Sequence, residues 1–421
     1  MKRKISLLIV MMLVLSTLTN VSADIIEGGV VLEDATDEEE TVEGDAQTDE
    51  TIEETEENEV LELSMNDAIK MAIEANIEMW EIDKSIGELQ DLKGQGNDFK
   101  ELYEELNEGP LLPGSSGYDY VTLILSKNNF FSKNAELRTE ELQKGKEQLL
   151  KGIEIDTVST YYKVLVAEKT IEINQSKLNK ANEQLRVVNL KFNNGSATKA
   201  EVLNAEMAVQ QAKTDLDSAI DDLNIAKLDL LNKIDLPFTQ EIVLTDIELS
   251  YIPTTELDLD KSIETAKVER LEIITAENNL ELQKIETHAY KSYYTSNLWQ
   301  NKVYTKKLED AEINVPRAYK DVELDVRKSY LNLVKAERSL VNMDKTVELA
   351  KEAARINKLL YDNGMATNLD VLEANTGLAQ AEIGHYQLLA VYNINKLMFD
   401  NSNILGSMPQ SSGGSAEEAP R

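Results

Sequence analysis

Two long stretches of the chain carry apolar side chains at the seven-residue spacing of a coiled coil. In the first stretch this spacing connects Val164, Ile171, Leu178, Leu185 and Phe192, and after a short break it connects Val202, Val209, Leu216, Leu223 and Leu230. The second run is accompanied, three residues further on each time, by Ala205, Ala212, Ala219 and Ala226. Such a recurrence predicts helices that pack along one seam, and a row of Ala lets two antiparallel helices approach closely. The expected fold class is therefore all-α, built from long antiparallel coiled-coil hairpins.

The breaks in the pattern have the residues of a tight turn between helices. They read FNNGSAT at 192–198 and YDNGMAT at 361–367. Gly adopts the left-handed conformation that ends a helix, and Thr is a favoured cap for the next helix. Residues 114–236 and 317–408 contain no Pro, so each window can hold a helix, the turn and a second helix. At 1.5 Å per residue, arms of roughly 45 to 55 residues would reach about 70 to 80 Å.

The two stretches are interpreted as copies of one unit. Tyr161–Leu228 aligns with Tyr330–Leu397 at a constant offset of 169, and Leu63–Ile69 matches Leu257–Ile263 at an offset of 194. The difference, 194 minus 169, means that the second copy has 25 fewer residues between its opening helix and its long helix. Such rods are too elongated to bury their own flanks, so bundling with other copies of the chain is expected. The expected organisation is a signal peptide at 1–23, an acidic linker at 24–60, a first helical repeat at 61–236, an extended linker at 237–256, a second helical repeat at 257–404 and a flexible tail at 405–421.

The duplicated unit resembles the TolC-type outer-membrane efflux family. The turn phrases Phe192–Ala205 and Tyr361–Ala374 are similar to its pattern [FY]-x-x-G-x-A-x-x-x-[DE]-V-L-x-A, and the phrase that begins at Leu63 is similar to its L-x-L-x-x-A-[LI]. The resemblance covers about residues 61–402. It implies a homotrimer that forms a hollow α-helical tunnel, a passive conduit for substrates exported by an inner-membrane pump.

The resemblance also implies roles for residues at the turns. In the family, the turns meet a periplasmic adaptor (membrane fusion) protein, and acidic residues just past the turn Gly narrow the pore. By position, Asp370 and Glu373 match this constriction pair, and Glu201 is the first-copy counterpart. The candidates for adaptor contact are Gly195, Ser196, Ala197, Gly364, Met365 and Ala366. The family's basic turn residue has no counterpart, since Ala is present at both matching positions.

Both the carboxylates and the whole chain admit a second interpretation. Three chains would bring the acidic residues together as a ring that attracts cations. Alternatively, they are solvated acids in the first turn of a helix, where the helix dipole favours negative charge. For the whole chain, the alternative is a non-transport coiled-coil structural or interaction protein of the cell envelope, which predicts a closed bundle or a monomer.

The segments where the family has its membrane-inserted strands are short in this chain. Residues 109–125 have room for one short strand, and residues 290–307 are polar and expected to be helical or a tight turn. Four strands of the ~9 to 11 residues that a membrane span needs cannot be found. We therefore expect β strands to be minimal or missing. An exported protein of the cell envelope is expected, and a cell without an outer membrane is favoured.

The N-terminal residues predict export. Residues 1–23 have a basic start, an apolar stretch and a small-residue end, which is typical of a cleaved secretory signal; an uncleaved anchor is the alternative. Residues 24–59 then hold 17 acidic side chains and no Lys or Arg. Self-repulsion predicts a disordered tether, with cation capture as the alternative. The formal net charge of -34 argues against a nucleic-acid partner.

Enzymatic chemistry is not expected. The 421 residues include no Cys and 2 His, and they contain no Gly-rich phosphate loop, nucleophile motif or metal-ligand spacing. His385 falls at a seam position, where a packed or pore-facing imidazole is expected, and His288 is expected near a helix end without a partner. Trp80 and Trp299 are expected to pack at helix ends. These features suit a passive conduit or scaffold that needs no cofactor or metal.

Overall fold

The computed structural model describes residues 60–106, 117–247, 249–251, 253–254 and 257–406. The chain divides into two units, Met1–Glu57 and Asn58–Arg421, and only the second lies within the described residues. The expected signal peptide, all but the last residue of the acidic linker, and residues 407–421 of the expected tail lie outside them. No helix in the described part of the chain is both long enough and apolar enough to cross a membrane.

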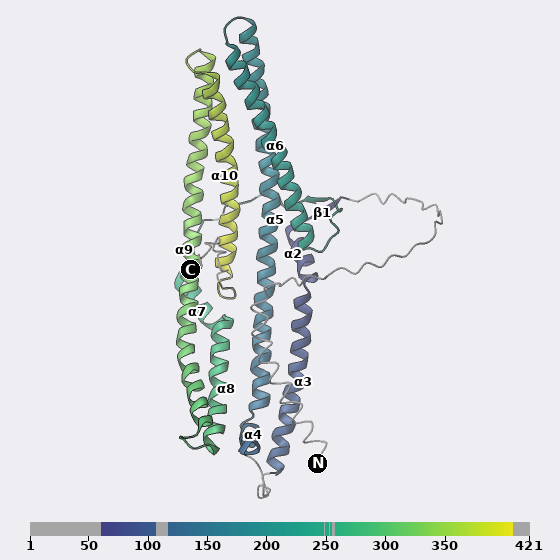
Figure 1. The fold of residues 1–421 in the computed structure, drawn as a ribbon, viewed down its shortest axis with the longest axis vertical. Coiled ribbons are helices and arrows are strands. Elements are labelled where there is room, and N and C mark those ends of the chain that lie inside the picture. The colour runs from purple at the N-terminus through teal and green to yellow at the C-terminus, as the bar shows by residue number, and fades with distance from the viewer. Residues whose placement is uncertain (1–59, 107–116, 248, 252, 255–256, 407–421) are drawn as a thin grey trace, which may run out of the picture. The chain divides into compact units, whose positions relative to one another are not determined.

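The described residues are almost entirely helical, which confirms the expected fold class (Figure 1). The two strands among them have three residues each and pair in parallel, with Leu61 opposite Ile242. In chain order the elements are β1 (Leu61–Leu63), α2 (Met65–Glu74), α3 (Ile77–Leu106), α4 (Gly117–Lys127), α5 (Phe130–Asn193), α6 (Lys199–Lys233), β2 (Ile242–Leu244), α7 (Leu259–Glu269), α8 (Leu271–Tyr293), α9 (Trp299–Asp362) and α10 (Asn368–Asp400).

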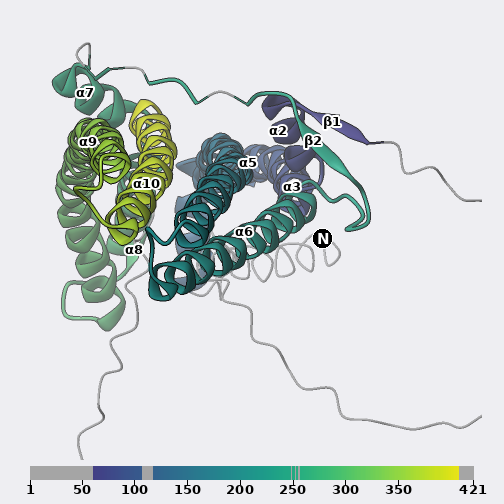
Figure 2. The same ribbon diagram turned by 90° about the horizontal axis from the view of Figure 1, so that it is seen from above.

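Two helical hairpins form the centre of the described unit. Helix α5 packs along α6, and α9 packs along α10. Helix α10 also packs against α5, so the four helices lie in the order α9, α10, α5, α6 (Figure 2). Most of the seam expected in α6 is buried, including the four alanines Ala205, Ala212, Ala219 and Ala226, while Val209 and Leu223 are partly exposed. The close approach predicted from this Ala row is therefore present.

The long arms of the hairpins exceed the expected length. Helices α5 and α9 have 64 residues each, which at 1.5 Å per residue is about 96 Å. The second arm extends beyond the Pro-free window 317–408, because α9 continues through Pro316. Pro316 is exposed, as is Glu312 one turn earlier, so the carbonyl that loses its amide partner faces water. Buried Ala311 and Val322 on either side hold the helix in place.

The short strand for which residues 109–125 had room is not formed in their described part. Residues 117–127 form helix α4 instead, while residues 109–116 lie outside the described residues. Val121 and Leu125 of α4 are buried in an apolar cluster with Leu282 and Ala289 of α8. This packing decides between helix and strand for a short apolar run, which periodicity alone cannot do. Residues 290–307 contain the end of α8, a turn and the start of α9, as expected.

A buried arginine joins the second opening helix to the end of α10. Arg270, between α7 and α8, is 2% exposed. Its guanidinium donates hydrogen bonds to Glu272 at 2.7 and 2.9 Å, to Asp325 at 3.1 Å, and to the carbonyl oxygens of Ser402 and Leu405 at 3.1 and 2.7 Å. Burial by itself would lower the pKa of Arg270, but the two carboxylates outweigh it and raise the pKa. We call this group the Arg270 cluster.

Candidate functional site at the helical turns

The two turns have the same backbone geometry. Gly195 and Gly364 have φ angles of 74° and 76°, in the left-handed region that favours Gly. The amide of Ser196 donates to the carbonyl of Lys191 at 2.7 Å, and Met365 donates to Leu360 at 2.8 Å. These bonds satisfy carbonyls that the ends of α5 and α9 would otherwise leave open. The Asn-Gly signal in the sequence therefore predicted both turns correctly.

A capping box follows each turn and uses two of the candidate constriction residues. The amide of Thr198 donates to the Glu201 carboxylate at 2.6 Å, and the amide of Glu201 donates to the Thr198 hydroxyl at 3.2 Å. Thr367 and Asp370 make the same pair of bonds at 2.7 and 3.3 Å. The side-chain and backbone hydrogen bonds from Thr367 lower the pKa of Asp370. Both carboxylates therefore stabilise helix starts, whatever else they do.

Glu373 lies one turn further along α10 and is exposed. It makes no hydrogen bond or ion pair with any residue that the structure describes. Residues three apart lie on one helix face, so Glu373 and Asp370 are neighbours on the surface of α10. Within the described residues of one chain, no hydrogen bond or ion pair links Glu201 to either of them. A ring of these carboxylates would need further copies of the chain and stays a prediction.

The two turns are held together by a small apolar cluster. Val188 and Val202 of the first hairpin pack with Tyr361 and Val371 of the second, and Ala205 completes the buried group. Beside it, the side-chain amide of Gln184 donates to the side-chain oxygen Oδ1 of buried Asn368 at 2.5 Å. The turns of one chain therefore form a single packed tip.

The candidates for adaptor contact divide into two sets at this tip. Ala197 and Ala366 pack against the apolar cluster and are only partly exposed. Exposed side chains or backbone are presented by Gly195, Ser196, Gly364 and Met365. This second set therefore offers the more accessible surface to another protein.

Lys191 is a tip residue that sequence reasoning missed. Its Nζ atom lies 3.5 Å from the centre of the Tyr361 ring and 3.5 Å from the Tyr361 carbonyl oxygen. A basic tip residue was expected only at the positions of Ala197 and Ala366, after the turn Gly, whereas Lys191 precedes the turn. Its place in the last turn of α5, where the helix dipole favours a cation, was the available signal.

The two histidines and the two tryptophans differ from one another in their surroundings. His385 Nε2 lies 2.7 Å from Asp344 Oδ1, with its side chain 29% exposed, so it is neither fully packed nor alone. His288 is exposed near the end of α8. The expectation that the tryptophans pack at helix ends is wrong: Trp80 and Trp299 are 66% and 72% exposed. Both stand in the first turn of a helix, α3 and α9, but neither ring is covered within the described unit.

The capping boxes give a direct stability prediction. Thr198→Ala and Thr367→Ala should each lower the free energy of unfolding by about 1 kcal/mol, because an amide at the helix start loses its acceptor. The effect is measurable by urea unfolding. Since the pKa of Asp370 is lowered from 3.8, its own contribution is present above that pH and is lost as the pH falls through the lowered value. Thr346→Ala is the control, because that hydroxyl only donates to Asn342 within an exposed helix face. An equal loss in the control would contradict the prediction.

Comparison with known proteins places the fold. No sequence-family profile matches the chain, and no curated protein matches it by sequence. Among solved structures, CusC, described as forming a transmembrane channel, is 12% identical with a TM-score of 0.62, over 82% of this chain and 92% of its own. The outer membrane protein VceC of Vibrio cholerae is 14% identical with a TM-score of 0.60, over 81% and 96%. The outer membrane channel CmeC of Campylobacter jejuni is 13% identical with a TM-score of 0.57, over 89% and 93%. The resemblance inferred from the turn and opening motifs is therefore confirmed at the level of the fold: this chain has the helical fold of the TolC-type outer-membrane channels.

Proposed function

We propose that the protein is a passive trimeric conduit of an export system in the cell envelope. Its partners are a periplasmic-adaptor-like protein at the helical turns and an inner-membrane pump that supplies energy and substrate choice. The channels of similar fold support this kind of role. It requires no catalytic group, and none is assigned. The observation that carries the proposal is a second, outward-facing line of apolar residues on each of two long helices.

The first line runs along α9. Its members are exposed and stand 11, 7, 18 and 7 residues apart, close to whole numbers of 3.6-residue turns; they are Ile313, Leu324, Leu331, Leu349 and Ile356. The opposite face of α9 carries Val322, Val326 and Leu333, which are buried inside the chain. One helix thus has two apolar faces, and its own chain covers only one of them.

The second line runs along α6. Leu203, Met207, Ile225 and Leu228 lie on one exposed face, opposite the buried alanine row. Helices α9 and α6 lie at the two ends of the row α9, α10, α5, α6 (Figure 2). The α9 line of one chain can therefore meet the α6 line of the next. Head-to-tail contacts of this kind form a closed ring when the rotation between neighbours closes, and the similarity to TolC-type channels favours such a ring with three members.

Assembly gives the first test of the proposal. Replacing Leu331 and Leu349 by Glu should dissociate the trimer, because each Leu loses about 2 kcal/mol of burial and a charge enters the contact. Analytical ultracentrifugation would measure the mass, and negative-stain imaging would show whether the wild-type particle is hollow.

The control is Asn332→Glu, which adds one such charge on a different, exposed face of α9. It should leave the trimer intact. A wild-type particle that is monomeric or has no open axis would contradict the conduit and favour a structural coiled-coil protein. A trimer that is unaffected by the two Glu substitutions would place the contact elsewhere.

A further inference from the structure

The joint between α8 and α9 has a charge opposite to that of the rest of the chain. Residues 287–308 contain four lysines and no Asp or Glu, in a protein of formal net charge -34. All four are exposed, and none makes an ion pair with another described residue; they are Lys291, Lys302, Lys306 and Lys307. Glu286 and Glu309 are the acids just outside this segment. Burial raises the pKa of Glu286, an effect that Lys307 opposes.

The same joint exposes large apolar and aromatic side chains. Tyr293, Leu298 and Trp299 are 48%, 42% and 72% exposed. In the same segment, the rings of Tyr290 in α8 and Tyr304 in α9 stack with their centres 3.5 Å apart. This stack joins the two helices. A pocket of about 450 Å³ opens here, with Trp299 and Tyr304 in its wall and the Lys307 side chain beside them. We call residues 287–308 the aromatic-basic joint.

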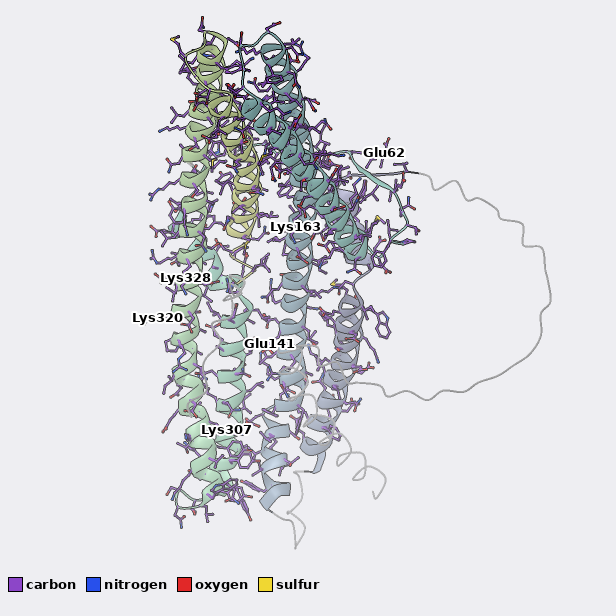
Figure 3. The ribbon with its side chains drawn as sticks, turned by 45° about the horizontal axis from the view of Figure 1, so that its top comes forward. Glu62, Glu141, Lys163, Lys307, Lys320 and Lys328 are labelled. Atoms are coloured by element: carbon purple, nitrogen blue, oxygen red, sulfur yellow. The ribbon has the colours of Figure 1, made fainter. Side chains whose placement is uncertain are left out.

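The aromatic-basic joint lies at the end of α9 opposite the turns. Trp299 begins this helix, and the turn Gly364 comes just after its 64 helical residues. At 1.5 Å per residue, the two ends are about 95 Å apart. Figure 3 labels Lys307 near this far end, with Lys320 and Lys328 further along α9. Whatever binds the joint is therefore separate from a partner at the turns.

We propose that the aromatic-basic joint binds an anionic phospholipid surface, with Trp299 and Tyr293 at the level of the headgroups and the four lysines against the phosphates. Trp and Tyr favour this interface because their rings are apolar and their edges polar. Lysines near an anionic membrane are attracted by its surface potential. The pocket beside Lys307 has room for a headgroup. The lysines alone would suit any anionic polymer, and the exposed aromatic residues are what favour a lipid.

The acidic remainder of the chain does not prevent this contact. At physiological salt the Debye length is about 8 Å, so charges further along helices of this length are screened from the surface. The inference does not depend on a conduit function, since it concerns the other end of the helices. It disagrees with the expectation of a cell without an outer membrane, because it places a lipid surface at the end of α9 that is remote from the turns.

Vesicle binding tests the inference. The protein without residues 1–23, the expected signal peptide, should float with vesicles of phosphatidylcholine and phosphatidylglycerol in equal parts. It should not float with vesicles of phosphatidylcholine alone. Lys302→Gln with Lys306→Gln should weaken binding about 30-fold, roughly fivefold per lysine. The matched control, Lys320→Gln with Lys328→Gln, removes two exposed lysines from the same helix and should leave binding unchanged.

The two tryptophans allow an optical test of the insertion itself. The chain has 2 Trp, so Trp80→Phe leaves Trp299 as its single indole fluorophore, and Trp299→Phe leaves Trp80. Emission of Trp299 should shift to the blue on mixing with the anionic vesicles and should be quenched by brominated lipid. Trp80, which is similarly exposed, should show neither change.

Three outcomes would overturn the inference. One is no binding to either vesicle. Another is a Trp299 emission unchanged by bound vesicles. The third is full competition of soluble polyphosphate with the vesicles, together with a Trp299→Ala variant that binds both polyphosphate and vesicles as tightly as the wild type. This result would make the aromatic-basic joint a site for an anionic polymer instead.

Discussion

Replacing Arg270 by Ala should lower the free energy of unfolding by about 3 to 5 kcal/mol. The substitution removes the ion pair between Arg270 and Asp325, whose side chain is 18% exposed. It also removes the donors that satisfy the carbonyls of Ser402 and Leu405. The loss is large because the variant removes, at one buried position, the ion pairs to Glu272 and Asp325 and the hydrogen bonds to two backbone carbonyls. Urea unfolding followed by circular dichroism measures it.

Three further variants separate this cause from a general effect of losing an arginine. Arg327→Ala removes an exposed pair with Glu323 on α9 and should cost less than about 1 kcal/mol. Arg270→Lys keeps the charge but loses the planar fork, so its loss should lie between the two. Arg270→Met combined with Asp325→Leu should recover part of the stability, since the less exposed carboxylate is removed together with the arginine and Glu272, at 45% exposure, stays hydrated. A loss of under about 1 kcal/mol in Arg270→Ala would show that the Arg270 cluster does not stabilise the contact between the start of α8 and the residues that follow α10.

The sequence predicted the tips well because their conformation is decided locally. A left-handed Gly, an Asn before it and a Thr three residues after it specify the end of one helix and the start of the next within a few residues. The coiled-coil seam was equally readable, since the alanine row of α6 is regular over 22 residues from Ala205 to Ala226. The turn repeats at the offset of 169, and so do the first two alanines of the row, as Ala374 and Ala381; each copy of the turn therefore supported the interpretation of the other.

The missed features depend on residues far apart in the chain. Arg270 binds Asp325 at a separation of 55 residues and the Ser402 carbonyl at 132, so no local pattern indicates the cluster. Lys191 meets Tyr361 only because the two hairpins pack side by side. Residues 117–127 have the composition of a short strand or a helix, and their packing against α8 decides the matter. Local signals specify elements and turns, whereas these contacts arise from how the elements pack.

If the proposed trimer is a conduit, Asp370→Asn with Glu373→Gln should abolish its selectivity for cations. Three copies would bring six carboxylates around the axis. Two unit charges about 10 Å apart interact by roughly 1.7 kcal/mol at an effective dielectric constant of 20, so the ring would hold multivalent cations firmly. Binding of cobalt(III) hexammine, measured by calorimetry on the purified trimer, should be lost in the double variant. Asp217→Asn, on an exposed position of α6 away from the turn, is the control and should bind as the wild type does.

The choice of Asn over Ala separates pore charge from helix capping. In the Asp370→Asn variant the side-chain amide oxygen can still accept from the Thr367 amide, whereas Asp370→Ala removes both the charge and the cap. If the carboxylates form a ring, the Asn and Ala variants should lose cation binding equally, and only the Ala variant should lose stability. Because the pKa of Asp370 is lowered from 3.8, its share of the cation binding should persist below that pH and disappear only as the pH falls through the lowered value. If the Asn and Gln pair binds cations as the wild type does, Asp370 is only a capping residue and the pore constriction lies elsewhere.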